Sequence, residues 1–173
     1  MPPQEEPRGR AHPANDQLLY LVNRVARAMN RASDDIALEH GLTLPELMVL
    51  LVLGEDVGLS NAQLARRTFV TSQSAHQVVI GLGERGLIER LPHPINRRIR
   101  VTRLTDAGWE VLERARLKVG EVEQRALKRL DPQERRALRP ALLHTAEALS
   151  GGWFGDAEAE AAATARRLGR SRG

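Results

Sequence analysis

Residues 60–85 read SNAQLARRTFVTSQSAHQVVIGLGER, which predicts two short helices joined by a turn of a few residues. Ser60 and Gln63 have the spacing of a capping box, in which each side chain bonds the other residue's backbone N–H, so the first helix is expected to start there. Thr71 is the expected N-cap of a second helix over residues 72–85. Helices of these lengths with so short a connection have helix-turn-helix proportions.

The second of these helices is predicted to have two different faces. At helical spacing its apolar residues share one side, which is expected to be buried: Ala75, Val78, Val79 and Leu82. Polar side chains fall on the opposite, outward side: Ser72, Gln73, His76 and Gln77. Residues 68–84 contain no Lys or Arg, so the outward face is polar but carries no strong positive charge.

A short antiparallel hairpin is predicted next, with strands over residues 87–91 and 99–104 and its tip at 92–96. In the second strand Ile99, Val101 and, less strongly, Arg103 alternate with Arg98, Arg100 and Thr102, which predicts one wet, basic face. Residues 84–105 hold six of the 26 basic and two of the 22 acidic residues, so this segment carries the whole net charge of +4. Such a patch fits either a polyanion-binding surface or a solvated loop.

Long amphipathic helices are predicted on both sides of this central region. One starts near Asp16 and ends at Gly41, with a single apolar stripe: Leu18, Val22, Val25, Met29, Ala32 and Ile36. Another runs from Thr105 to about Leu130, and a last one, interrupted by Pro140, runs to about Leu149. A central domain this small offers these stripes no obvious partner, so we expect them to bury one another across a two-fold axis.

Composition excludes several classes of function. The chain has 173 residues and no cysteine, which excludes a disulfide scaffold, a thiolate metal site, a cysteine nucleophile and a thiol redox sensor. The five histidines are scattered and no catalytic constellation is visible, so we expect no metal, no cofactor and no enzymatic activity. No apolar run approaches the ~18–20 residues of a membrane span and no signal peptide is visible. A cytoplasmic protein without a membrane partner is therefore expected.

The order of these elements resembles the MarR-type (multiple antibiotic resistance regulator) winged helix-turn-helix family. The motifs that carry the resemblance are residues 61–67, 70–71, 84–90 and 96–108. The resemblance implies a mostly α fold with a small β-hairpin wing, in which a winged helix-turn-helix domain is flanked by dimerisation helices. It predicts five segments: a flexible arm (1–15), an N-terminal dimerisation helix (16–43), the DNA-binding domain (44–104), C-terminal dimerisation helices (105–150) and a flexible Ala/Arg-rich tail (151–173).

In function, the resemblance implies a sequence-specific transcriptional regulator, a ligand-responsive repressor that binds a pseudo-palindromic operator in double-stranded DNA as a homodimer. The expected DNA contacts are Thr71, Ser72, Gln73, Ser74, His76 and Gln77 of the recognition helix, Ser60 and Asn61 of the first helix, and Arg97, Arg98 and Arg100 of the wing. The expected dimer contacts are Leu18, Val22, Val25, Val119, Val122 and Leu142. A small aromatic or phenolic effector is expected between the DNA-binding domain and the dimer helices, with Trp109 as a candidate pocket residue.

Two departures from the family pattern carry their own expectations. The recognition helix lacks the arginine that pairs most often with guanine, which predicts an A·T-leaning half-site or weak direct readout. Asn96 stands where the family commonly has Asp, which predicts a looser wing. The alternative from another class is a winged-helix protein-interaction module that reads little or no DNA sequence; the uncharged helix favours it, whereas the basic hairpin opposes it.

Overall fold

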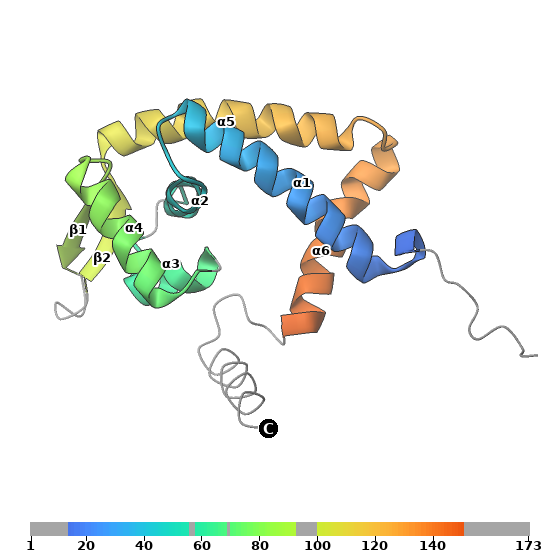
Figure 1. Cartoon of the computed structure of the whole chain (residues 1–173), viewed down its shortest axis with the longest axis horizontal. Helices are drawn as coiled ribbons and strands as arrows, with labels where there is room; N and C mark the ends of the chain where they lie inside the picture. Colours follow the sequence, from blue (N-terminus) through green and yellow to red (C-terminus); the bar gives the residue numbers. More distant parts are fainter. Residues whose placement is uncertain (1–13, 56–57, 69, 93–99, 151–173) are drawn as a thin grey trace, which may run out of the picture.

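The computed structural model describes residues 14–55, 58–68, 70–92 and 100–150. The elements follow in the order expected, with a 3-10 turn η1 (Ala14–Asp16) before the first long helix (Figure 1). The helices are α1 (Leu18–Glu39), α2 (Leu44–Leu53), α3 (Asn61–Arg67), α4 (Ser72–Glu84), α5 (Asp106–Leu127) and α6 (Pro132–Ser150). The strands β1 (Ile88–Pro92) and β2 (Arg100–Leu104) form an antiparallel hairpin between α4 and α5. The predicted mostly α fold with one small hairpin is confirmed.

Helix α2 is the centre of the hydrophobic core. Leu47, Leu50 and Leu53 on this helix are fully buried, and they pack with Leu82 of α4 and Leu112 of α5. Glu46 and Thr43 form the capping box that starts α2, with Glu46 Oε2 accepting from the Thr43 N–H at 2.7 Å. We call α2, α3, α4, the hairpin and the start of α5 the lobe.

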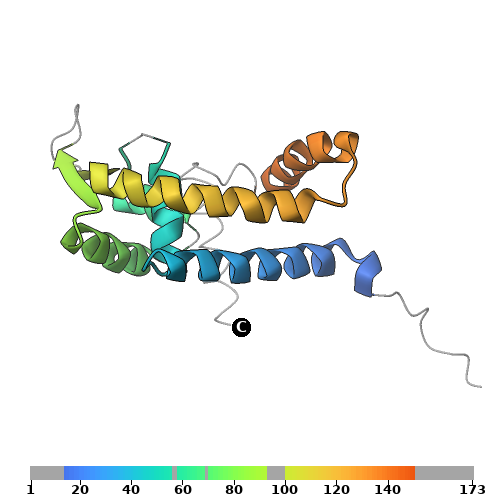
Figure 2. The ribbon, with the colours of Figure 1, turned by 90° about the horizontal axis from the view of Figure 1, so that it is seen from above.

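Helices α1 and α5 contact each other and both extend away from the lobe; they run alongside each other in Figure 2 and diverge with distance from the lobe in Figure 1. Helix α1 ends at Gly41, whose φ of +65° is a left-handed conformation that glycine adopts without strain. Helix α6 turns back from the far end of α5; it crosses α1 in Figure 1, but Figure 2 shows the two helices apart. We call residues 18–29 of α1, together with α6, the stem.

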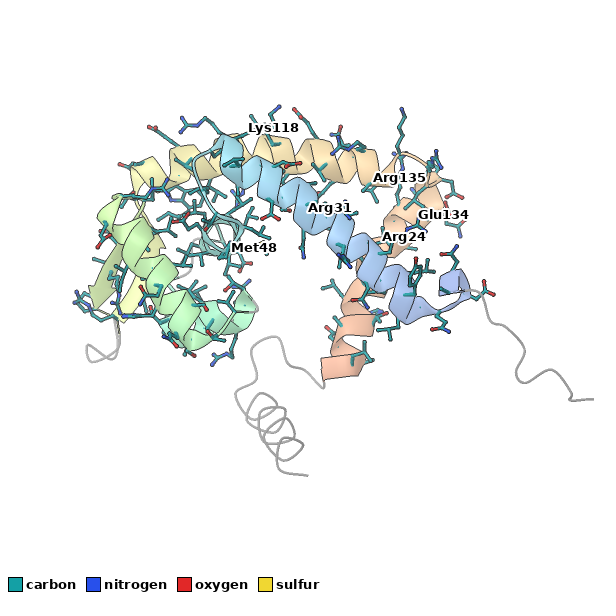
Figure 3. The ribbon with its side chains drawn as sticks, viewed as in Figure 1. Arg24, Arg31, Met48, Lys118, Glu134 and Arg135 are labelled. Carbon is teal, nitrogen blue, oxygen red and sulfur yellow. The ribbon has the colours of Figure 1, made fainter. Side chains whose placement is uncertain are left out.

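Side chains are distributed very differently between lobe and stem. In Figure 3 the side chains of the lobe gather around α2, close to Met48, whereas Glu134 and Arg135 at the start of α6 lie at the turn from α5, away from that cluster. Large apolar side chains of the stem are exposed to solvent: Leu18, Leu19, Tyr20, Leu21, Val22, Val25, Leu138, Leu142, Leu143 and Leu149. The stem therefore has an apolar surface that this single chain does not cover.

The hairpin differs from the predicted alternation at Thr102 and at Arg103, which was grouped less strongly with Val101 and is exposed. Thr102, predicted on the wet face with Arg100, is completely buried, as is its neighbour Val101. The reason is that β2 is bonded on both edges: it pairs with β1 on one side, and on the other Thr102 exchanges two backbone hydrogen bonds with Leu59, at 2.8 and 3.2 Å. The C-terminal end of α5 also differs from the prediction: the helix ends at Leu127 and not near Leu130.

Candidate nucleic-acid interface

The two helices of the predicted helix-turn-helix start at the predicted caps. Ser60 Oγ accepts from the Gln63 N–H at 3.4 Å, while the Gln63 side chain accepts from the Ser60 N–H at 2.9 Å. Thr71 Oγ1 accepts from the Ser74 N–H at 3.1 Å at the start of α4. Both caps satisfy backbone donors that a helix start leaves without intrahelical partners, so the entry to each helix is fixed locally.

Helix α4 has the two predicted faces. Ala75, Val79 and Leu82 are buried against the lobe, and Val78 is half-buried. The predicted DNA-contacting residues of this helix are all exposed: Thr71, Ser72, Gln73, Ser74, His76 and Gln77. Ser74 Oγ lies 2.9 Å from Thr71 Oγ1, so this hydroxyl takes part in the cap as well. The result is a polar, solvent-facing helix surface that starts at a capped N-terminus.

A side-chain contact joins the two helices at this surface. Asn61 Nδ2 on α3 lies 3.2 Å from Nδ1 of His76 on α4. Both residues were predicted as separate DNA contacts, but their pairing was not, because 15 positions separate them and only the packing of α3 on α4 brings them together. Ser60, the other predicted residue of the first helix, is half-buried and held in its capping box.

The hairpin adds positive charge beside α4. Arg97 and Arg98, the first two predicted wing residues, lie outside the described residues. Arg100 is exposed on β2, and Arg90, which the sequence prediction omitted, is exposed on β1 opposite Thr102. Arg90 lies in the first predicted strand, close to the predicted tip, and this position could have placed it among the predicted wing contacts. Exposed arginines at this position suit phosphate contacts, which add affinity without sequence information.

The lobe is fastened to the long helix through Arg116. Its Nη2 donates to the carbonyl of Gly54, the C-cap of α2, at 2.9 Å, and its guanidinium lies 5.8 Å from the ring centroid of Trp109. Trp109 is half-buried and packs against the core cluster. The predicted pocket residue therefore sits at the junction of lobe and long helix, with a cation above its ring. The seven-residue spacing from Trp109 to Arg116 places both on one helix face, a signal that was not used.

The predicted dimer residues fall into two groups. Leu18, Val22, Val25 and Leu142 are exposed on the stem, and Val25 alone exposes 62% of its surface. Val119 and Val122 are half-buried and pack against the core of their own chain. The first group has surface to offer a second molecule, whereas the second already serves the contact between α5 and the core.

A capped helix-turn-helix, followed by an antiparallel hairpin and packed beneath a long helix, defines a winged helix-turn-helix protein. Comparison with known proteins agrees: the model of the MarR family matches residues 40–99. The repressor Rv2887 of Mycobacterium tuberculosis is 34% identical over 117 residues, 67% of this chain and 84% of that protein. The regulator TtmR of Methylorubrum extorquens is 34% identical over 95 residues, 54% of this chain and 48% of that protein. The chain belongs to the MarR family of transcriptional regulators.

Solved structures support the same assignment. The crystal structure of CouR from Rhodococcus jostii bound to p-coumaroyl-CoA superposes with a TM-score of 0.72 at 20% identity, covering 84% of this chain and 98% of that one, which shows the shared fold. Rv2887 complexed with DNA superposes with a TM-score of 0.61 at 30% identity, covering 75% and 97%. Rv2887 complexed with p-aminosalicylic acid gives 0.63 at 30% identity, covering 75% and 98%.

Family membership makes the chain a DNA-binding transcriptional regulator, a class that acts without enzymatic chemistry. Across the described ranges, no single helix is long and apolar enough to span a membrane; α1 and α2 meet the criterion only as a pair bent by 88°. In the same ranges, no three His, Asp or Glu side chains form a group that could hold a metal ion.

Proposed function

We propose that this regulator is a ligand-responsive repressor that binds a pseudo-palindromic operator as a homodimer. The observation that carries the proposal is the exposed polar face of α4, which starts at the Thr71 cap and lies in the same lobe as the arginines of the hairpin. A helix of this kind fits the major groove with its first residues toward the bases. Rv2887, which has been solved in complex with DNA, has this fold at 30% identity.

In this proposal the exposed polar residues of α4 read base edges, and the cap at Thr71 approaches a phosphate. Arg97, Arg98 and Arg100 contact the backbone or minor groove from the wing, and Asn61 and Ser60 support them from α3. The predicted division of the chain stays part of this proposal, with the DNA-binding domain at residues 44–104 and dimerisation helices at 16–43 and 105–150. The predicted arm (1–15, of which only 14 and 15 are described) and tail (151–173) lie outside the described residues.

The proposed dimer rests on the uncovered apolar surface of the stem. Leu18, Val22 and Val25 recur on one face of α1, and Leu142 and Leu143 are exposed on α6. Monomeric proteins rarely leave contiguous apolar patches of this kind in water, so a second copy is the natural cover. A two-fold dimer places two copies of α4 against two half-sites about one helical turn apart, which requires a pseudo-palindromic operator.

The proposed effector is a small aromatic acid that binds near Trp109 at the junction of lobe and long helix. A carboxylate there can compete for Arg116, which now holds the carbonyl at the end of α2. Binding would shift the lobes only if the ligand prefers one arrangement over the other. Rv2887 has been solved with salicylic and with p-aminosalicylic acid, which makes salicylate the first ligand to test.

The test begins with a pool of random duplexes enriched on the full-length protein. Fluorescence anisotropy then compares the enriched duplex with a scrambled one over a range of salt concentrations, and sedimentation equilibrium gives the oligomeric state. The expected result is a dimer that prefers the enriched, two-fold symmetric duplex, with a steep decrease of affinity as salt rises. Salicylate should weaken this binding and change the fluorescence of Trp109 in a Trp153→Phe background.

Equal, weak binding to both duplexes would contradict a sequence-specific repressor and favour the protein-interaction module. A stable, folded monomer at micromolar concentration would contradict the proposed dimer. Salicylate that alters neither DNA affinity nor Trp109 fluorescence would remove this class of effector. The three parts of the proposal are therefore tested separately.

A further inference from the structure

His76 is the one imidazole among the exposed polar side chains near the start of α4. The helix contains no Lys or Arg from Ser72 to Glu84, so its other outward side chains over the first two turns are hydroxyls and amides. His76 is exposed, yet its ring is held, because Nδ1 lies 3.2 Å from Asn61 Nδ2. A ring in the middle of the expected reading surface is thus fixed by a residue from the neighbouring helix.

The Asn61 side chain makes few other interactions besides its contact with His76. It is half-buried, its Oδ1 is buried without a partner, and His76 is the one hydrogen-bond partner of its side chain in the described part of the chain. A buried amide oxygen without a partner costs free energy, so this arrangement is not explained by the stability of α3. It is explained if the amide serves to hold the imidazole.

The contact also determines which hydrogen-bonding group His76 has left to offer. A neutral imidazole has one N–H donor and one bare nitrogen acceptor. If the Asn61 amide N–H donates to Nδ1, the proton must be on Nε2. No described residue bonds to Nε2, so the ring presents an oriented N–H donor to whatever approaches α4.

We propose that Asn61 and His76 form one base-reading unit, in which Asn61 is a positioning residue and the Nε2–H of His76 donates to guanine in the major groove. This inference rests on the proposed DNA-binding function and deepens it. Guanine presents two adjacent acceptors, N7 and O6. Adenine has an N6 donor next to its N7, which repels an N–H, and thymine offers O4 alone beside a methyl group, so guanine is the base that an N–H donor favours most. One G·C pair is therefore specified in each half-site, in place of a half-site that leans only toward A·T.

Fixing the ring beforehand strengthens this readout. An exposed imidazole free to rotate loses side-chain entropy when it binds, and a ring already held by Asn61 loses less. Removing Asn61 should therefore weaken the preference for guanine at the position that His76 reads, without altering preferences elsewhere in the site.

The experiment uses the full-length protein and the duplex enriched on it, with each position changed in turn to the other three base pairs. Affinities are measured for the wild type, His76→Ala, Asn61→Ala and the double variant. Gln77→Ala, another proposed base-reading residue of α4, tests whether the effect is specific to the position that His76 reads. His76→Ala should lose about tenfold discrimination for guanine at one symmetry-related pair of positions. Asn61→Ala should lose most of the same discrimination, and the double variant no more than His76→Ala alone. Gln77→Ala should leave that position unchanged.

Three results would overturn the unit. One is a His76→Ala variant that keeps the wild-type base preferences, and another is a double variant whose losses are the sum of the two single losses. The third is a loss in Asn61→Ala that is uniform over all sequences, which would make Asn61 a backbone contact. Thermal melting verifies that each variant is folded. Failure of the proposed function itself is visible separately, because the wild type would then prefer no sequence at all.

Discussion

The lobe and the stem use the same kinds of apolar residue with opposite results. Leu47, Leu50 and Leu53 of the lobe are fully buried by helices of their own chain. Leu142, Leu143 and Leu149 of the stem are exposed, Leu149 by 85%. Burial thus depends on what packs against a leucine and not on the leucine itself.

The difference shows which part of the fold is complete within one chain. The lobe has capped helices, a hairpin and a continuous core, so it holds the proposed reading surface in a fixed geometry. The stem has regular helices but no cover for their apolar sides. Substitutions should therefore have different effects in the two regions. Those in the lobe core should lower the stability of the fold, and those on the stem should weaken association with a second chain.

The largest effect is expected at Gly108, where the first turn of α5 meets the lobe. Thr105 Oγ1 donates to the Gly86 carbonyl at 2.7 Å, and a Cβ added at Gly108 would overlap the backbone carbonyl oxygen of Leu87. Gly108→Ala should cost about 4 kcal/mol or more, measured by urea unfolding, because backbone has to move. Gly120→Ala is the matched control: a Cβ there meets nothing within 4 Å, and the variant should gain about 0.5–1 kcal/mol.

A Gly108→Ala variant within 1 kcal/mol of the wild type would show that the joint of lobe and long helix is loosely packed. The lobe would then be a less rigid platform than its core suggests, and the contrast with the stem would weaken.

The next largest effect is expected on the association of the stem. Val25→Glu places a charge on the apolar stripe of α1, so it should raise the dimer dissociation constant at least tenfold, which corresponds to ~1.4 kcal/mol. Leu38→Glu is the control: Leu38 is more exposed than Val25, at 78% against 62%, but lies off the stripe, at the lobe end of the same helix. Sedimentation equilibrium on a dilution series measures both. Equal effects of the two variants would mean that the stripe is not the interface.

How far the sequence predicts this structure depends on the range of the interactions. Caps are local signals, and those at Ser60 and Thr71 were predicted and are confirmed. Thr102 was assigned to the wrong face, because its burial depends on a backbone bridge to Leu59, some forty positions earlier in the chain.

The candidate site shows the same limit. The exposed face of α4 follows from helical periodicity, so its residues could be listed from the sequence. The pairing of Asn61 with His76 and the anchoring of Arg116 on Gly54 arise only when helices pack, and no local pattern signals them. The half-burial of Val119 and Val122 was missed likewise, because a helical stripe does not say which partner covers it.

A third, smaller effect separates arginines of the lobe from arginines of the stem in DNA binding. Arg100→Ala should weaken binding to the enriched duplex several-fold and reduce the slope of log affinity against log salt by about one, because one phosphate contact is lost. Arg27→Ala, an equally exposed cation on the stem, should change neither quantity. Anisotropy at several salt concentrations measures both variants. A comparable loss from Arg27→Ala would show that the stem, too, approaches DNA.

The smallest effect concerns acid stability in the lobe, where Arg67 of α3 forms an ion pair with Glu55 after α2. The hydrogen bond from Arg67 lowers the pKa of the Glu55 carboxyl below its ordinary value near 4.5. A carboxyl whose pKa is lower in the folded state stabilises the fold fully above its unfolded pKa and loses this contribution as pH falls through the folded pKa. Both side chains are partly exposed, so the contribution should stay below about 1 kcal/mol.

Urea unfolding of Glu55→Gln should therefore match the wild type more closely as the pH falls below about 4.5, and differ from it most near neutral pH. Arg67→Gln removes the same ion pair from the other side. Its difference from the wild type in free energy of unfolding should therefore shrink over the same pH range. A Glu55→Gln variant that follows the wild type at every pH would mean that the pair adds nothing. The lobe would then owe its stability to its apolar core, which the stem lacks within one chain despite its leucines.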